Sequence, residues 1–317
     1  MKRLIIWIVG LAAVLGADSC QKELNYLAGD TAVTFEVSAD EVATKAIADG
    51  TNIDVLYWEL YGSDPKSASA PLGEGVVRDN DGDKNFTVNL KLIADQNYNI
   101  VFWAQVDGQD HYIVNDLRSV KINSYDDENA NDETRAAFFA VYPFSTENGT
   151  AINETVSLNR PFAQINLGTT KYETSLTLVN SGKVKVESTE ITVSNVANSF
   201  NTIDGIGVIE DNFSGLVTFT ASETPNGEDD ATKMLLAVNG ESYYWLGMNY
   251  LIVTGNSDNV TVDITINTNM GVVKNSIDNV PVKENHRTNI LGNILTTDSE
   301  FEIIVDEKFD DDNIHAL

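Results

Sequence analysis

The sequence is short of cysteine, of histidine and of basic residues. Among 317 residues there are one cysteine, three histidines, and 20 Lys and Arg against 48 Asp and Glu, so the formal charge is −28. A single cysteine excludes an internal disulfide, and packing alone must stabilise the fold. So acidic a chain repels nucleic acid and anionic membranes, and both are excluded as partners. The charge is compatible with cation binding or, as we favour, with solubility at a crowded cell surface.

The sequence also lacks the motifs of common enzymes. It has no G-x-S-x-G, no H-E-x-x-H and no phosphate-binding P-loop, and the glycines at Gly205 and Gly207 are not followed by the third glycine of a dinucleotide fingerprint. His111, His286 and His315 are far apart, without the spacing of metal ligands. We therefore expect no enzyme activity, no catalytic residue and no cofactor.

One acidic run suggests a metal site. Asp79, Asp81 and Asp83 alternate in RDNDGDKN, and carboxylates at alternate positions are typical of calcium loops. An EF-hand needs glycine at the sixth position and an acid at the twelfth, where this chain has Lys84 and Leu90. A tight turn between strands explains the same residues, so we expect a turn here and no metal site.

The first twenty residues predict export and a lipid anchor. Lys2 and Arg3 precede an uncharged apolar run at 4–15, which is too short to span a bilayer. Small residues follow, and then the lone Cys20. This pattern predicts a lipoprotein signal peptide at 1–19 and acylation of Cys20, for example with palmitate. The alternative is an ordinary secreted protein with a stray thiol. Gln21 favours the outer membrane over retention in the inner membrane.

Alternation of apolar and polar residues dominates the remaining sequence. It is clear in TAVTFEVSA, NFTVNLKLIA, NVTVDITIN and FEIIVD, separated by loops rich in Asn, Asp and Gly. Helical periodicity is scarce: the best candidates are 132–142, for a short helix before its Phe-rich end, and 286–295. The pattern predicts an all-β chain of sandwich type. Tyr57, Trp58, Phe102 and Trp103 lie in strand-like runs and are expected in the core.

The length of the chain predicts two domains. We expect a tether at 20–30, an N-terminal β-sandwich at 31–160 and a C-terminal β-sandwich at 161–317.

Several segments resemble the fimbrillins of Bacteroidales. At the beginning these are the strand TAVTFEV, the basic residue of ATKAIADG and the strand TNIDVLYWELY. The most specific are the runs RPFAQIN at 160–166 and RTNILGN at 287–293, and the likeness extends over most of the chain beyond the signal peptide.

The resemblance implies two transthyretin-like antiparallel β-sandwich domains in tandem, in a surface lipoprotein that builds or decorates fimbriae. In polymerising members a protease cuts after a basic residue that follows the first strand. A strand of the next subunit then fills the groove, which is a form of β-augmentation. Lys45 matches the basic position, and Val33, Phe35 and Val37 match the side chains that would be displaced.

Two questions stay open at this point. The implied partners are other fimbrial subunits or ligands on host or bacterial surfaces, with membrane contact only through the lipid. However, the final residues DDDNIHAL are short and polar for a donor strand, so an accessory, anchor or non-polymerising role is an alternative to a stalk subunit. A different function is glycan capture by a surface lipoprotein of an outer-membrane uptake system, which an exposed, coplanar aromatic platform would favour.

Overall fold

The computed structural model describes residues 29–39, 53–123, 125, 132–171, 184–221, 235–255, 257–295 and 301–305. Regular structure in these ranges is almost entirely β, which confirms the all-β prediction. The helical elements there are three short 3-10 turns, Leu117–Ser119, Glu133–Arg135 and Glu147–Gly149. Cys20, Lys45 and His315 lie outside the described residues.

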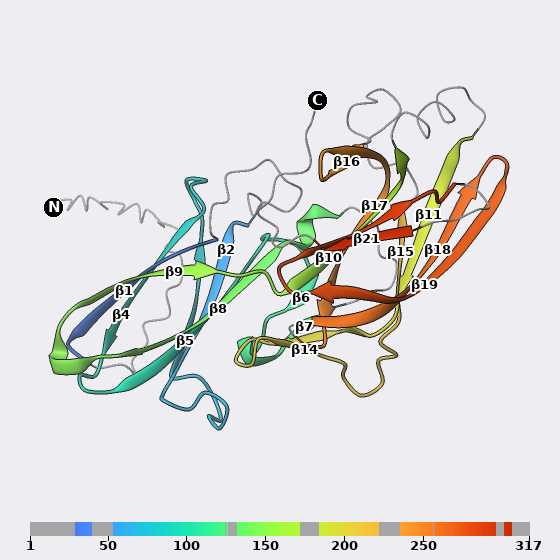
Figure 1. Ribbon diagram of the computed structural model, residues 1–317. Helices are drawn as coiled ribbons and strands as arrows, with labels where there is room; N and C mark the ends of the chain where they lie inside the picture. Colours follow the sequence, from blue (N-terminus) through green and yellow to red (C-terminus); the bar gives the residue numbers. More distant parts are fainter. Residues whose placement is uncertain are drawn as a thin grey trace, which may run out of the picture.

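Two sheets form the amino-terminal part, at the left of Figure 1. Their strand orders are β4-β1-β9 and β3-β2-β5-β8. The strands are β1 (Thr31–Ala39), β2 (Val55–Tyr61), β3 (Gly73–Arg78), β4 (Asn85–Leu92), β5 (Asn97–Gln105), β8 (Ala137–Ser145) and β9 (Ile152–Leu158). One hydrophobic cluster, the first core, lies between the two sheets, and all its buried members fall between residues 33 and 158. In β1 and β4 every second side chain points into it, as the alternation predicted.

Two further sheets form the carboxyl-terminal part. Their strand orders are β15-β11-β18-β19 and β12-β17-β10-β20-β21, and β16 also pairs with β17. The strands are β10 (Phe162–Lys171), β11 (Val186–Val193), β12 (Val196–Ala197), β15 (Val217–Ala221), β16 (Leu235–Val238), β17 (Glu241–Val253), β18 (Ser257–Thr268), β19 (Gly271–Lys283), β20 (Arg287–Gly292) and β21 (Phe301–Val305). Between these sheets lies the third core, which includes Ile165, Ile191 and Ile264.

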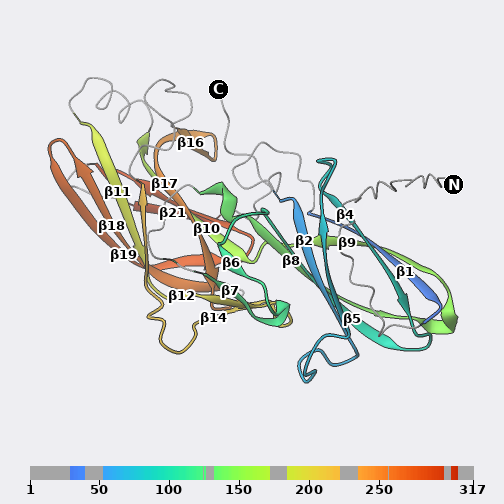
Figure 2. The ribbon, with the colours of Figure 1, turned by 180° about the vertical axis from the view of Figure 1, so that it is seen from behind.

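A small sheet lies between the two parts, as the opposite views of Figures 1 and 2 show, and a second core packs beside it. The sheet has the order β14-β13-β7-β6. Its strands are β6 (Tyr112–Ile113), β7 (Val120–Ile122), β13 (Ser199–Asn201) and β14 (Ile206–Val208). The second core joins side chains from both parts, among them Trp103, Phe139, Phe200 and Met248. The expected division at residue 160 stays a prediction.

The second core explains why several strands lack clean alternation. In β17 the stretch Tyr243–Val253 is buried without a break. Some of its side chains, such as Met248 and Ile252, pack into the second core, whereas others, such as Leu251 and Val253, pack into the third. A strand with both faces covered reads as a continuous apolar run.

One expectation from periodicity is corrected. The run 286–295 contains strand β20 and not a helix, because β20 is buried on both faces and such a run has no period-two signature. In 132–142 the short 3-10 turn Glu133–Arg135 precedes strand β8, which agrees with the expected short helix before the Phe-rich end. In addition, β1 pairs with β9 and β10 pairs with β20 in parallel, while the other pairs are antiparallel. Among the residues described, no helix is long and apolar enough to cross a membrane.

Candidate functional site

The first described strand, β1, occupies the middle of its sheet. On one side it pairs antiparallel with β4, where Phe35 faces Val88. On the other it pairs parallel with β9, where Phe35 faces Glu154. A strand with hydrogen-bonded neighbours on both sides is normally part of the permanent fold, yet β1 is the first strand that the structure describes. Its removal would leave two unpaired strand edges with a slot between them.

The inward side chains of β1 fill the first core. Val33, Phe35 and Val37 are at most 1% exposed, so the structure places them in the core as the sequence suggested. The Phe35 ring makes edge-to-face contacts with Phe102, Tyr142 and Phe144 at centroid distances of 5.1–5.9 Å. Such pairs add to the stabilisation from burial. Whether these side chains can be displaced stays a prediction.

The outward side chains of β1 are polar and bonded across the sheet. The Thr34 hydroxyl donates to the Asn89 amide oxygen at 2.9 Å, and the Thr87 hydroxyl donates to the Glu36 carboxylate at the same distance. Just before β1, the backbone of Gly29 passes so close to Leu92 that a Cβ would overlap its carbonyl group. Glycine is required there for close approach of the two backbones. After Ala39 the chain continues through 40–52, which includes Lys45 and lies outside the described residues.

The Asp79, Asp81 and Asp83 run forms a turn between β3 and β4. Asp79 accepts hydrogen bonds from the backbone N–H groups of Asp81, Gly82 and Lys84 at 2.7–3.3 Å. Burial of the carboxylate tends to raise the pKa of Asp79, but the bonds from Gly82 and Lys84 outweigh this effect and lower it to about 2. Among the described residues this is the one group of three or more acidic, His or Cys side chains close enough to share an ion. Asp81 and Asp83 are exposed, whereas the Asp79 side chain is buried within the turn and pairs with Lys84 Nζ at 3.3 Å.

The two described histidines each make a local hydrogen-bond contact. His111 Nε2 lies 2.8 Å from the Thr134 hydroxyl, and burial lowers the pKa of His111, which favours the neutral ring. His286 Nδ1 lies 2.7 Å from the backbone oxygen of Glu284. The aromatic residues expected in the core are found there: Phe102 and Trp103 are fully buried and Trp58 nearly so, whereas Tyr57 is half-buried.

A buried polar cluster beside the second core was not predicted. Glu59, 5% exposed, accepts hydrogen bonds from the Tyr61 hydroxyl and from the Leu117 N–H. Burial raises the pKa of Glu59, and the two hydrogen bonds partly oppose the rise. Arg118 lies 5.2 Å from the centre of the Tyr61 ring, and the Thr202 hydroxyl donates to the carbonyl of Leu117 at 2.6 Å. The cluster ties β2 to a segment of the carboxyl-terminal part. The one feature of the sequence that could have indicated this cluster is the lone acid, Glu59, in the apolar strand VLYWELY.

The two motif runs that carry the resemblance lie side by side. In the parallel pair of β10 and β20, Gln164 is opposite Arg287 and Asn166 is opposite Asn289. All four are at most 2% exposed. The Asn166 amide donates to the Asn289 amide oxygen at 2.8 Å. A shifted register would break this bond and leave two buried amides unpaired, so the bond favours the observed pairing.

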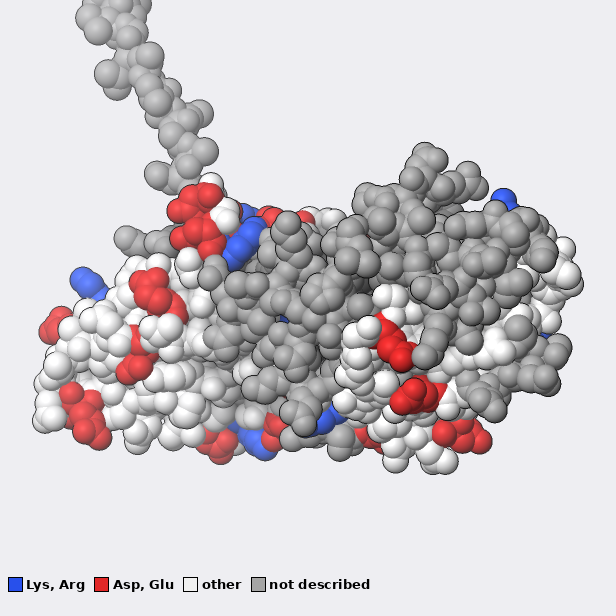
Figure 3. Space-filling model, turned by 45° about the horizontal axis from the view of Figure 1, so that its top comes forward, with Lys and Arg blue, Asp and Glu red and all other residues white. Residues whose placement is uncertain are grey.

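On the face seen in Figure 3, acidic side chains are scattered over the described residues and basic ones are fewer. A family described as a family of unknown function, DUF6562, matches residues 25–316. The chain belongs to this DUF6562 family. No curated protein matches it.

Solved structures similar to this DUF6562 chain come from Bacteroides and its relatives. One from Bacteroides thetaiotaomicron, described provisionally as a polysaccharide-binding protein (DUF1812), has a TM-score of 0.52 and 13% identity, over 86% of this chain and 94% of its own. The tip fimbrial protein Mfa3 of Porphyromonas gingivalis has a TM-score of 0.45 and 12% identity, over 86% of this chain and 99% of its own. A fimbrial assembly protein of Parabacteroides distasonis also has a TM-score of 0.45 and 12% identity, over 87% of this chain and 98% of its own.

The likeness of fold that the resemblance implies is confirmed by the Bacteroides thetaiotaomicron structure, whose TM-score exceeds 0.5. Other solved neighbours are named as fimbrial or adhesin proteins. At these identities the role of each neighbour belongs to that protein.

Proposed function

We propose that this chain is a cell-surface lipoprotein of the fimbrillin type, held at the outer membrane through Cys20, which acts as a structural or accessory subunit of fimbriae. Its partners are other fimbrial subunits, joined by complementation of a β-strand. The fimbrial and adhesion names of the solved neighbours support the general role.

The observation that carries the proposal is the position of β1. It is the first described strand, it fills the centre of a three-stranded sheet, and it buries Val33, Phe35 and Val37. Burial of each such side chain stabilises by about 1.5–3 kcal/mol. Since the net stability of a domain is about 5–15 kcal/mol, loss of β1 would remove a large part of it. An incoming strand that replaces β1 restores the pairing with β4 and β9 and fills the first core.

Lys45 is the proposed point of release. Cleavage there would separate β1, together with Cys20 and its lipid, from β2 and all later strands. The lipid therefore holds the precursor at the membrane until β1 is exchanged. No catalytic chemistry of this chain is required, because the protease and the incoming strand come from outside.

A trypsin-like protease tests the proposal. Purified wild-type protein, Lys45→Ala and a matched control, Lys91→Ala, would be digested briefly and followed by mass spectrometry and size-exclusion chromatography. We expect cleavage after Lys45 and growth of oligomers in the wild type and in Lys91→Ala, but in Lys45→Ala neither. Cleavage at Lys45 that leaves a stable monomer would contradict strand complementation and leave an anchor or accessory role.

A second candidate function is glycan binding, which the description of the Bacteroides thetaiotaomicron neighbour suggests. Sugar recognition commonly uses exposed aromatic rings for stacking. The large apolar side chains that the structure shows exposed are Leu72, Val76, Ile93, Ile113, Val208, Leu216, Met270 and Val272. None of these is aromatic, so they give the glycan proposal no support.

A further inference from the structure

Strand β9 depends on β1 for its place in the sheet. It is the edge strand of the order β4-β1-β9, so its ladder of hydrogen bonds is formed with β1. If β1 leaves, as the proposed strand exchange requires, β9 loses this whole ladder. The strand that replaces β1 must nevertheless pair with β9 in turn. What holds β9 in place at that moment must therefore lie outside its own sheet.

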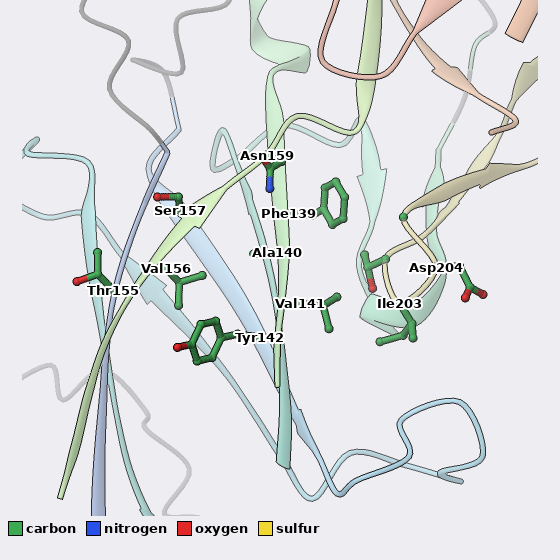
Figure 4. A pocket seen from close by; sticks show the side chains of 12 residues that line it. Phe139, Ala140, Val141, Tyr142, Thr155, Val156, Ser157, Asn159, Ile203 and Asp204 are labelled. Atoms are coloured by element: carbon green, nitrogen blue, oxygen red, sulfur yellow. The ribbon is translucent and has the colours of Figure 1, made fainter. Parts of the chain in front are cut away.

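Three contacts join β9 to β8, the edge strand of the opposite sheet. The turn Glu147–Gly149 links the two strands at one end. At the other end Phe139 and Asn159 exchange two backbone hydrogen bonds, each 2.8 Å long. Between these ends the Tyr142 hydroxyl donates to the Glu154 carboxylate at 2.7 Å. From this bond toward the Phe139–Asn159 bridge, a hollow of about 390 Å³ separates the strands (Figure 4).

Glu154 occupies an inward position of β9. In the parallel ladder it is opposite Phe35, whose side chain fills the first core. Val156 and Leu158, in the same phase of β9, are buried in that core. A half-buried carboxylate in such a position needs a polar partner, because burial of an unpaired charge is costly. Tyr142 supplies this partner from the opposite sheet.

Tyr142 connects this hydrogen bond to the pocket of Phe35. Its ring packs at the border of the first core and makes an edge-to-face contact with Phe35 at a centroid distance of 5.9 Å. Figure 4 shows the Tyr142 side chain turned from β8 toward β9, next to Val156. The bond to Glu154 therefore fixes both the ring that contacts Phe35 and the strand that lies opposite Phe35 in the sheet.

We propose that Tyr142 and Glu154 form a latch that holds β9 against β8 as the outer wall of the slot of β1. The latch slows the opening of β9 and β1 in the intact chain, and it keeps the wall in place for the strand that replaces β1. The second role rests on the proposed function. The first is a property of the uncleaved protein. Both residues act as positioning residues, and neither takes part in cleavage at Lys45.

The test is native-state hydrogen exchange of the full, uncleaved protein, read by mass spectrometry. Tyr142→Phe removes the hydroxyl and keeps the ring. We expect the amides of β9 and β1 to exchange about fivefold faster than in the wild type, the effect of one hydrogen bond, and those of β5 to be unchanged. The matched control is Tyr98→Phe, which removes from the same core a hydroxyl that lies 3.5 Å from the Ile93 carbonyl oxygen. It should not accelerate β9 selectively.

A double-mutant cycle assigns the effect to the bond itself. Glu154→Ala removes the acceptor and should produce the same selective acceleration of β9 and β1. The combined variant, Tyr142→Phe with Glu154→Ala, should exchange no faster than either single variant, because each substitution already removes the same hydrogen bond.

The latch is overturned if Tyr142→Phe leaves the exchange of β9 unchanged, if it accelerates β5 as much as β9, or if the effects of the two substitutions add. Proteolysis does not enter this test, so its outcome and that of the strand-exchange experiment can be told apart. A wild type that is cleaved at Lys45 and stays monomeric would contradict strand exchange and leave the latch standing.

Discussion

Glu284 shows how the position of one carboxylate governs the dependence of stability on pH. It lies in the turn between β19 and β20, and burial raises the pKa of Glu284 to about 7 from an ordinary value of 4.5. The folded state therefore holds a proton that the unfolded state releases between these two pH values. This contribution to stability is complete below pH 4.5 and is lost as the pH rises through 7.

Replacement of Glu284 by glutamine is expected to remove this pH dependence. At pH 8 the variant should be more stable by about 1–2 kcal/mol, since one pKa unit corresponds to about 1.4 kcal/mol and partial exposure screens some of the effect. At pH 4 it should match the wild type. Denaturant unfolding at both values measures the difference, with the exposed Glu74→Gln as control. Equal stability of Glu284→Gln and wild type at pH 8 would contradict the prediction.

Cys20 carries a second prediction at this scale. If its thiol is the site of acylation, Cys20→Ala should move the protein from the membrane fraction to the soluble fraction, because no other cysteine can take its place. Cell fractionation with immunodetection measures this, and Ser19→Ala is the matched control. A Cys20→Ala protein that still sediments with the outer membrane would contradict lipid anchoring there.

Single residues were predictable where a local pattern determines them. The inward direction of Val33, Phe35 and Val37 followed from alternation alone. The burial of Glu59 and Glu284 did not, because it depends on what the fold brings next to them. Glu284 stands in the polar run KENH, where the sequence indicates an exposed turn.

Among the elements, β1 is the one whose packing can be tested directly. Phe35→Ala should lower the free energy of unfolding by about 3–5 kcal/mol, because it leaves a cavity among Phe102, Tyr142 and Phe144. Glu36→Ala, on the exposed side of the same strand, should cost about 0.5 kcal/mol or less.

Chemical denaturation of both variants makes the comparison. If Phe35→Ala costs no more than Glu36→Ala, β1 does not stabilise the first core.

The sequence predicted which segments form strands, but it did not predict which strands pair with each other. Alternation identified β1, β4 and β18, and turn residues separated them. It gave no sign that β1 and β10 each pair in parallel with a strand more than a hundred residues away in sequence. Periodicity reports which face of a strand is buried and contains no information about its neighbours. For β20, with both faces covered, even the type of element was ambiguous.

At the scale of the whole molecule, the second core is expected to make unfolding cooperative. Trp103, on β5, is fully buried there, and its ring lies 6.2 Å from that of Phe200 on β13, in the small sheet between the two parts. We expect one calorimetric transition for the wild type. Trp103→Ala should cost about 3–5 kcal/mol and separate the transition into two.

The buried Phe219→Ala, in the third core, is the control that should destabilise without separating the transition. Two transitions in the wild type would show that the parts unfold independently. Differential scanning calorimetry gives the answer.

The parallel pair of β1 and β9 has a consequence for the order in which the chain folds. The two strands are about 120 residues apart, so β1 is synthesised long before its partner is available. Closing so long a loop is slow. The contact between β8 and β9, which are neighbours in sequence, closes only a short loop and can form early. We therefore expect β1 to be among the last strands to dock in the nascent fold. A strand that docks last enters a slot whose walls are already held by the rest of the fold, and for the same reason it can be the first to leave.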